Sequence, residues 1–179
     1  MIQKVALILI NVIFGSMVLL SYYNGLTKEP QLSAKLWGGV PSILHPIIIT
    51  FMFISAVGYF FFTYNFLFNV DANKIFFLNR FNYWSLHILY LLILIPSMLW
   101  IKLTFKYMMS GNSLDWIFVV IALSSVAIAS IFLFLFTIDL NMIAKPFIYL
   151  TSIIGVSIFT FHTLFLDGFI WIFFFNKTN

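Results

Sequence analysis

The chain has no cysteine and very little charge. Its 179 residues include nine basic and five acidic side chains, 8% of the total, whereas soluble proteins carry about 25%. The missing cysteine excludes disulfide bridges and thiolate metal sites. So few charged groups cannot give a 20.8 kDa protein a polar surface. Most of the surface must therefore face a medium other than water.

The few cations do not form a patch. The formal net charge is +4, but lysine and arginine stand singly along the chain. Nucleic-acid binding needs clustered cations, so the sequence predicts no nucleic-acid partner. Scattered cations are typical of anchors at the lipid headgroups.

Apolar residues dominate instead, at 63% of the chain, against about 45–50% in soluble domains. A membrane-spanning helix needs about 20 largely apolar residues. Five stretches qualify, and none shows the alternation of a β-barrel strand. They are approximately residues 5–23, 47–68, 84–105, 116–138 and 147–175. The sequence predicts an all-α, multi-pass integral membrane protein, a single domain over residues 1–179 with the lipid bilayer as its partner.

The first stretch has some features of a signal peptide, because Lys4 precedes an apolar run ending at Leu20. No small-x-small cleavage site follows, so we expect an uncleaved span. The long connection 24–46 contains three prolines and cannot be one helix. Within it we expect a short interfacial helix, with Leu32, Leu36 and Trp37 near one face.

The short turns 107–115 and 139–145 predict that helices adjacent in sequence pack antiparallel. Orientation should follow the excess of cations on one side of the membrane. Four cations fall on one side and five on the other, so the count gives no orientation. The two sets are Lys4, Lys74, Arg80 and Lys145, against Lys28, Lys35, Lys102, Lys106 and Lys177.

Small residues recur at helical spacing within the spans and predict helix–helix contacts, because close backbone approach stabilises packing in lipid. These positions are Asn11, Gly15 and Val18; Ser55 and Gly58; Ala122, Ser125 and Ala129; and Thr151 with Gly155. Pro96 lies within the third span, where it cannot donate to the carbonyl of Leu92, and a kink is expected there.

Ionisable residues inside a span are site candidates by default. His87 lies near Trp84, at an expected interface. His162 and Asp167 lie in the last span. Their separation of five residues places them about 140° apart on an α-helix, so we expect no direct pair. Asp167 should instead share a face with Thr160 and Thr163. His162 can be a packed side chain or a site, and Asp167 an interfacial cap or a functional carboxylate.

Catalytic motifs are missing from the sequence. The three histidines and five carboxylates are dispersed, without H-E-x-x-H, a Gly-rich phosphate loop or G-x-S-x-G. We therefore favour a non-enzymatic protein, and the sequence specifies no cofactor or metal. Aromatic residues are abundant, with 24 Phe, 8 Tyr and 5 Trp. Tryptophans near span ends fit an interfacial belt, while phenylalanines can face lipid or line an apolar cavity.

Two short patches carry a family resemblance. Tyr22-Tyr23-Asn24-Gly25-Leu26-Thr27-Lys28-Glu29-Pro30 is similar to Trp-Tyr-x-x-Leu-x-Lys-Pro with one insertion, and Leu166-Asp167-Gly168-Phe169-Ile170-Trp171 to Leu-Asn-x-x-x-Trp. Both motifs belong to the tryptophan-rich sensory proteins, or translocator proteins. The Pro-Val-Trp of the family's second span is missing, its Asn-x-x-Trp-Ser becomes Phe81-Asn82-Tyr83-Trp84-Ser85, and tryptophan is scarcer.

The resemblance implies a five-helix bundle with an apolar pocket beneath the first connection, for a tetrapyrrole or a sterol-like lipid. The resemblance selects Tyr23, Trp37, Asp167 and Trp171 as ligand-binding candidates. His162 is added because it is an ionisable residue inside a predicted span. Binding or transport of a hydrophobic small molecule is thus the leading hypothesis. The alternatives are a structural or assembly subunit of a membrane complex or a homo-oligomer, and a proton or ion pathway using His162 and Asp167.

Overall fold

The computed structural model describes residues 2–140 and 145–176. Five of its helices are long and apolar enough to cross a membrane, as the sequence predicts. In chain order the elements are α1 (Ile2–Lys28), α2 (Pro30–Ser33), η1 (Ser42–Leu44), α3 (His45–Phe68), β1 (Phe76–Phe77), β2 (Phe81–Asn82), α4 (Trp84–Ser110), α5 (Ser113–Asp139), α6 (Pro146–Phe161), η2 (His162–Trp171) and α7 (Ile172–Phe175). The last three form one continuous helix, Pro146–Phe175, called the last helix below.

The helices extend beyond the apolar runs that predicted them. α1 continues to Lys28 and α4 to Ser110, because capping groups, and not hydropathy, end a helix. Gly111 adopts the left-handed conformation (φ 62°) that closes α4, and the side chain of Asn112 accepts a hydrogen bond from the Leu114 amide at the start of α5. The short helix expected in the first connection is α2, a single turn. Lys177 and residues 141–144 of the last turn lie outside the described residues.

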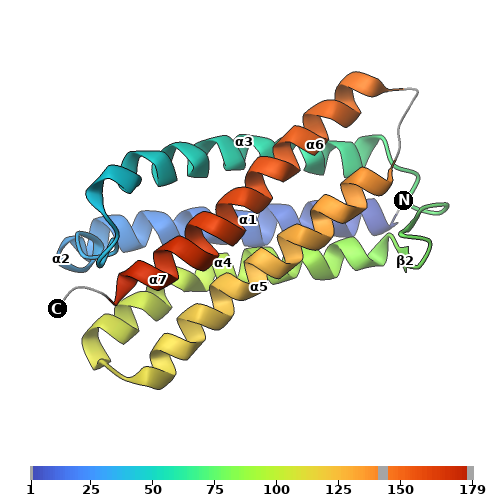
Figure 1. Ribbon diagram of the computed structural model, residues 1–179. Coiled ribbons are helices and arrows are strands. Elements are labelled where there is room, and N and C mark those ends of the chain that lie inside the picture. The colour runs from blue at the N-terminus through green and yellow to red at the C-terminus, as the bar shows by residue number, and fades with distance from the viewer. Residues whose placement is uncertain (1, 141–144, 177–179) are drawn as a thin grey trace.

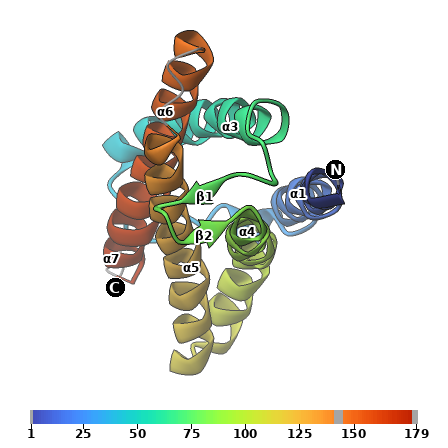
Figure 2. The same cartoon turned by 90° about the vertical axis from the view of Figure 1, so that its right-hand side faces the viewer.

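The five long helices form two layers (Figures 1 and 2). α1, α3 and α4 run alongside one another in one layer, and α5 and the last helix cross them obliquely in the other. α1 packs mainly on α4, α4 on α5, α5 on the last helix, and α6 on α3. Contact between α1 and α3 is slight, and the Tyr59 hydroxyl of α3 donates there to Asn11 of α1.

Two glycines bring α3 and α6 into backbone contact. A Cβ added to Gly58 would lie 2.6 Å from the Gly155 carbonyl oxygen, and one added to Gly155 would lie 2.7 Å from the Gly58 carbonyl oxygen. The Ser55 hydroxyl donates to the Ile158 carbonyl across the same crossing, at 3.3 Å. The prediction that these small residues form a helix interface is confirmed. Any larger side chain at either glycine would push the two helices apart.

Hydroxyl groups form further links between helices. Pro96 leaves the Leu92 carbonyl of α4 without its usual helical donor, and the Ser125 hydroxyl of α5 donates to that carbonyl at 3.0 Å. The Ser21 hydroxyl of α1 donates to the Met98 carbonyl at 2.6 Å. In lipid such bonds supply the partners that water would otherwise provide.

α1 uses a different small residue from the one expected. Gly15 has no atom within 4 Å of an added Cβ, so its predicted place in a helix interface is wrong. Gly25, two to three turns further along, packs against Ile101 of α4, whose side chain would lie 2.5 Å from an added Cβ. α1 packs mainly on one long helix, α4. Helical spacing alone does not predict which face of such a peripheral helix contacts its neighbour.

Gly58 and Gly15 provide a matched pair of substitutions. We expect Gly58→Ala to lower the free energy of unfolding by about 1–3 kcal/mol, because the new methyl group overpacks the α3–α6 crossing. Gly15→Ala makes the same chemical change in open space and should leave stability unchanged or slightly raised, since alanine favours helix. Thermal unfolding in detergent micelles, followed by circular dichroism, measures both. Equal stability of the two variants would contradict the close crossing.

Candidate functional site

The last helix changes its hydrogen-bond register between His162 and Trp171. This ten-residue segment, η2, is a π-helix, in which each amide bonds the carbonyl five residues earlier, and such segments are rare and frequent at functional sites. Gly168 lies inside it. An added Cβ there would meet the Thr163 carbonyl oxygen at 2.9 Å, and Ala127 of α5 lies 3.6 Å away. A glycine thus suits both the wide turn and the close approach of α5.

The π-helix brings His162 and Asp167 together. His162 Nε2 lies 3.3 Å from Asp167 Oδ2. The sequence-based prediction that the two side chains cannot pair is therefore wrong, because it assumed α-helical spacing. In the π register, residues five apart lie one above the other along the helix. His162 is largely buried, with 9% of its side chain exposed, while Asp167 keeps 32% exposed.

The surroundings of this pair are partly polar. Thr160 and Thr163 were expected to serve Asp167, but their hydroxyls donate to the Ser130 carbonyl and hydroxyl of α5, at 3.0 and 2.9 Å. Tyr22 of α1 lies within electrostatic range of the Asp167 carboxylate. Within the described part of the chain, His162 Nδ1 is buried without a hydrogen-bond partner. The two threonines, and not the His162–Asp167 pair, therefore bond the last helix to α5.

Trp171 lies in an aromatic cluster at the end of the same π-helix. Its Nε1 donates to the Leu36 carbonyl at 2.9 Å. Its ring centroid lies 5.5 Å from that of Trp100 and 6.0 Å from that of Trp116. Three of the five tryptophans therefore pack together inside one end of the bundle, and the first connection is tied to the last helix through the Leu36 carbonyl.

The remaining predicted ligand-binding residues lie apart from the pair. Trp37 stacks on His45, with ring centroids 4.1 Å apart, and the His45 ring bonds the Val40 carbonyl. This contact closes the first connection onto the start of α3. Tyr23 is 65% exposed, on the outer surface of α1. The structure brings His162 and Asp167 into contact, but it gathers no single cavity lined by all five predicted residues.

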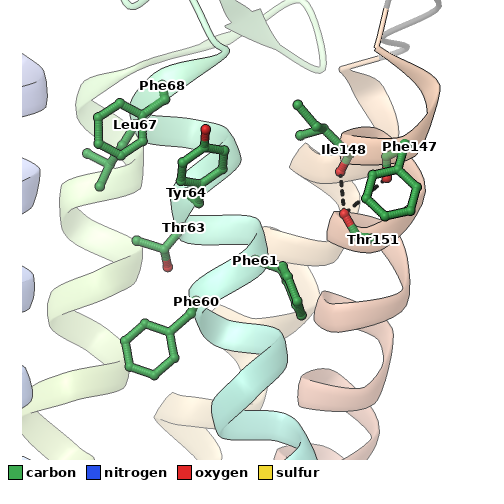
Figure 3. A pocket seen from close by; sticks show the side chains of 9 residues that line it. All are labelled: Phe60, Phe61, Thr63, Tyr64, Leu67, Phe68, Phe147, Ile148 and Thr151. Atoms are coloured by element: carbon green, nitrogen blue, oxygen red, sulfur yellow. Dashed lines mark hydrogen bonds between the residues drawn. The ribbon is translucent and has the colours of Figure 1, made fainter.

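A groove that the sequence did not predict lies between α3 and α6 (Figure 3). Its volume is about 560 Å³. It is lined by Phe60, Phe61, Thr63, Tyr64, Leu67, Phe68, Phe147, Ile148 and Thr151. Figure 3 shows Phe61 of α3 directed toward α6, with Thr151 on the facing side.

The groove begins where the two helices stop touching. Next to the Gly58–Gly155 contact, the facing positions change from glycine to large side chains such as Phe61 and Tyr64. These side chains hold α3 and α6 apart toward the end of α3 and the start of α6. The only sequence signal was the phenylalanine run 60–62 beside Gly58. Of that run, Phe62 is fully buried in the core, and its two neighbours line the groove.

The site carries no preformed metal centre in the part of the chain that the structure describes, where no three His, Asp or Glu side chains come together. Comparison of the chain with family models, curated proteins and solved structures found no match. The features of the structure that bear on function are therefore the groove and the His162–Asp167 pair.

The contact between His162 and Asp167 can be tested by magnetic resonance. In protein labelled with ¹⁵N-histidine, Asp167→Asn should shift the His162 imidazole resonances, because Nε2 loses its neighbouring carboxyl group. His87 is the internal control, since its Nε2 donates to the Gln3 carbonyl at 2.8 Å and should not change. An unaltered His162 signal in the variant would show that the two side chains are not in contact.

Proposed function

We propose that this protein binds a lipid-like hydrophobic molecule from the bilayer in the groove between α3 and α6. The main support for this proposal is the size and the lining of the groove. Its volume of about 560 Å³ falls within the roughly 300–1,000 Å³ of small-molecule sites. Its lining is almost entirely apolar and aromatic; the Thr63 hydroxyl bonds Tyr90, and the Thr151 hydroxyl donates to carbonyls of its own helix.

The position of the groove supports this proposal. It is lined by side chains on the outer surface of the bundle, such as Phe60, Phe61 and Phe147, which are 71%, 49% and 76% exposed. A molecule dissolved in the bilayer can therefore enter sideways, without a path through water. The finer prediction of a tetrapyrrole or sterol-like ligand rests on the family resemblance, which implied a pocket beneath the first connection and not this groove; the aromatic walls of the groove would also suit flat rings.

Thr151 and Leu150 offer a matched test on one helix. Thr151 lines the groove, whereas Leu150 is 56% exposed beside it. We expect Thr151→Phe to fill the groove and reduce cross-linking of a photoactivatable acyl lipid or sterol to α3 and α6 several-fold. Leu150→Phe should leave the cross-linking unchanged. Peptide mapping by mass spectrometry after illumination of proteoliposomes provides the measurement.

The same experiment can reject the proposal. The proposal would be rejected if labelling were equal on α1 and on the α3–α6 surface and did not change in Thr151→Phe. Such labelling would indicate ordinary lipid contact without a binding site. Labelling by the sterol and not by the acyl lipid, or the reverse, would identify the shape of ligand that the groove accepts.

The assembly role suggested by the small-residue stripes has less support. Ala122 and Ala129 are buried within the chain, at 6% and 1% exposure. Gly155 contacts Gly58, and the Ser125 hydroxyl binds the Leu92 carbonyl. These residues pack the protein's own helices, so they offer no surface for a further subunit.

A proton pathway is the second candidate, because one observation favours it. His162 and Asp167 lie in contact within a membrane-spanning helix, and intramembrane pairs of this kind occur in proton relays. Five helices supply few other polar residues to line a path, so such a path would require an oligomer.

Proton flux into liposomes tests this candidate. If the pair carries protons, Asp167→Asn should reduce the flux to that of protein-free liposomes, because the neutral amide cannot exchange the proton. Asp71→Asn, in the loop after α3 where the carboxylate is 53% exposed, serves as the control and should retain the flux. Flux that is the same in wild type and Asp167→Asn would remove the pathway.

A further inference from the structure

A second hollow lies at the loop that follows α3. This hollow has a volume of about 190 Å³ and is lined by Asn69, Val70, Asp71, Lys74, Ile75 and Leu140. Phe68, the last residue of α3, lines the groove, and Asn69, the next residue, lines the hollow. Consecutive residues at the end of α3 therefore line the groove and the hollow.

The end of α3 lies at the depth of the lipid headgroups. α3 has 24 residues, which at 1.5 Å per residue span about 36 Å, more than the ~30 Å hydrocarbon layer. The groove is lined by the last turns of α3 and the first turn of α6. A molecule whose apolar part lies in the groove would thus place its polar end near the hollow.

The polar groups at this point are mainly hydrogen-bond donors. Lys145 Nζ, just before α6, donates to Asn69 Oδ1 at 2.7 Å and joins the ends of the two helices. Among the described residues, Asn69 Nδ2 is buried with no hydrogen-bond partner. Lys74 is 85% exposed, and its Nζ lies 3.8 Å from Asp71 Oδ2. Lys74 is thus paired with a carboxylate, whereas Lys145 bonds only a neutral amide among the described residues.

Such a donor set suits an anion. A buried donor without an acceptor is unfavourable, and a phosphate oxygen would supply the acceptor that Asn69 Nδ2 lacks among the described residues. Lysine is a common phosphate binder in proteins; Lys145 bonds Asn69, and Lys74 lines the same hollow as Asn69. Asp71 and Asp139, which precedes Leu140, carry opposing charge; Asp71 Oδ1 accepts from the Asn73 amide at 3.0 Å and Asp139 Oδ2 from the Leu78 amide at 2.6 Å.

We propose that the groove and the hollow together bind one anionic phospholipid. An acyl chain occupies the α3–α6 groove, and the phosphate lies among Lys145, Lys74 and Asn69. This inference rests on the proposed function and adds the chemical class of the ligand. Lipid selectivity then depends on the charge at the hollow, while the strength of binding to any lipid depends on the groove.

Native mass spectrometry of the detergent-purified protein tests the inference. The protein is titrated with phosphatidylglycerol and, separately, with zwitterionic phosphatidylcholine of the same acyl chains. We expect the wild type to bind phosphatidylglycerol several-fold more tightly. Lys145→Gln should abolish this preference, and Lys145→Arg should keep it. Lys28→Gln, which removes an exposed cation at the last residue of α1, is the control and should also keep it.

The outcomes separate the two proposals. Thr151→Phe should weaken both lipids equally, because it fills the groove and leaves the hollow intact. The proposed recognition of an anionic headgroup would be wrong if the wild type bound the two lipids equally, or if its preference survived Lys145→Gln. Either result would leave the proposal of lipid binding in the groove intact. Lipid binding indifferent to Thr151→Phe would overturn the groove as well. Circular dichroism of each variant checks that a loss of binding is not a loss of folding.

Discussion

The bundle depends on one constraint of the bilayer. Lipid tails are as apolar as leucine, so burial of apolar surface does not by itself draw helices together, and no water satisfies an exposed backbone group. The contacts that remain are close backbone approach and hydrogen bonds from hydroxyls to carbonyls. Both occur at the interfaces: Gly58 lies against Gly155, and Ser21 and Thr160 donate to carbonyls of neighbouring helices.

The same constraint explains why the groove lies where it does. Two helices that cross at an angle touch only near the crossing point, and beyond it they move apart. Large side chains can occupy the widening space between them. α3 and α6 cross obliquely (Figure 1), so the glycine contact at Gly58 and Gly155 is local. The space beyond it is shaped by phenylalanines, and lipid can occupy that space. Tight packing at one level of the bundle and an open groove at another therefore have one cause.

The number and class of spans could be predicted from the sequence, because hydrophobic length is a strong signal. The placement of Gly58 and Gly155 at helix interfaces could also be predicted, since small residues are conspicuous among large ones, but their contact with each other could not. The His162–Asp167 pair was not, because nothing in the residue order marks a π-helix, and the α-helical assumption placed the two on different faces. The groove was missed because it depends on the crossing geometry of two helices, which periodicity along one helix does not contain.

The candidate site was therefore predicted in part. His162 and Asp167 stood out because charge is rare in the spans, and the structure brings them together. Trp171 stood out through the family resemblance, yet its indole is engaged with the Leu36 carbonyl. Asn69 and Lys145 gave no signal at all. Loop residues become neighbours only when α3 and α6 are placed side by side, and their spacing of 76 residues conceals that.

Pro96 and Ser125 have a consequence for how this protein can change over time. A proline on one helix creates a vacant acceptor, and a serine on the next helix occupies it. Without the serine, the proline would leave the Leu92 carbonyl with no donor in the hydrocarbon layer. Without the proline, that carbonyl would bond within its own helix, and the serine would lose this partner. The two positions should accordingly be inherited as a unit, so that in descendants of this chain a change at one favours a compensating change at the other.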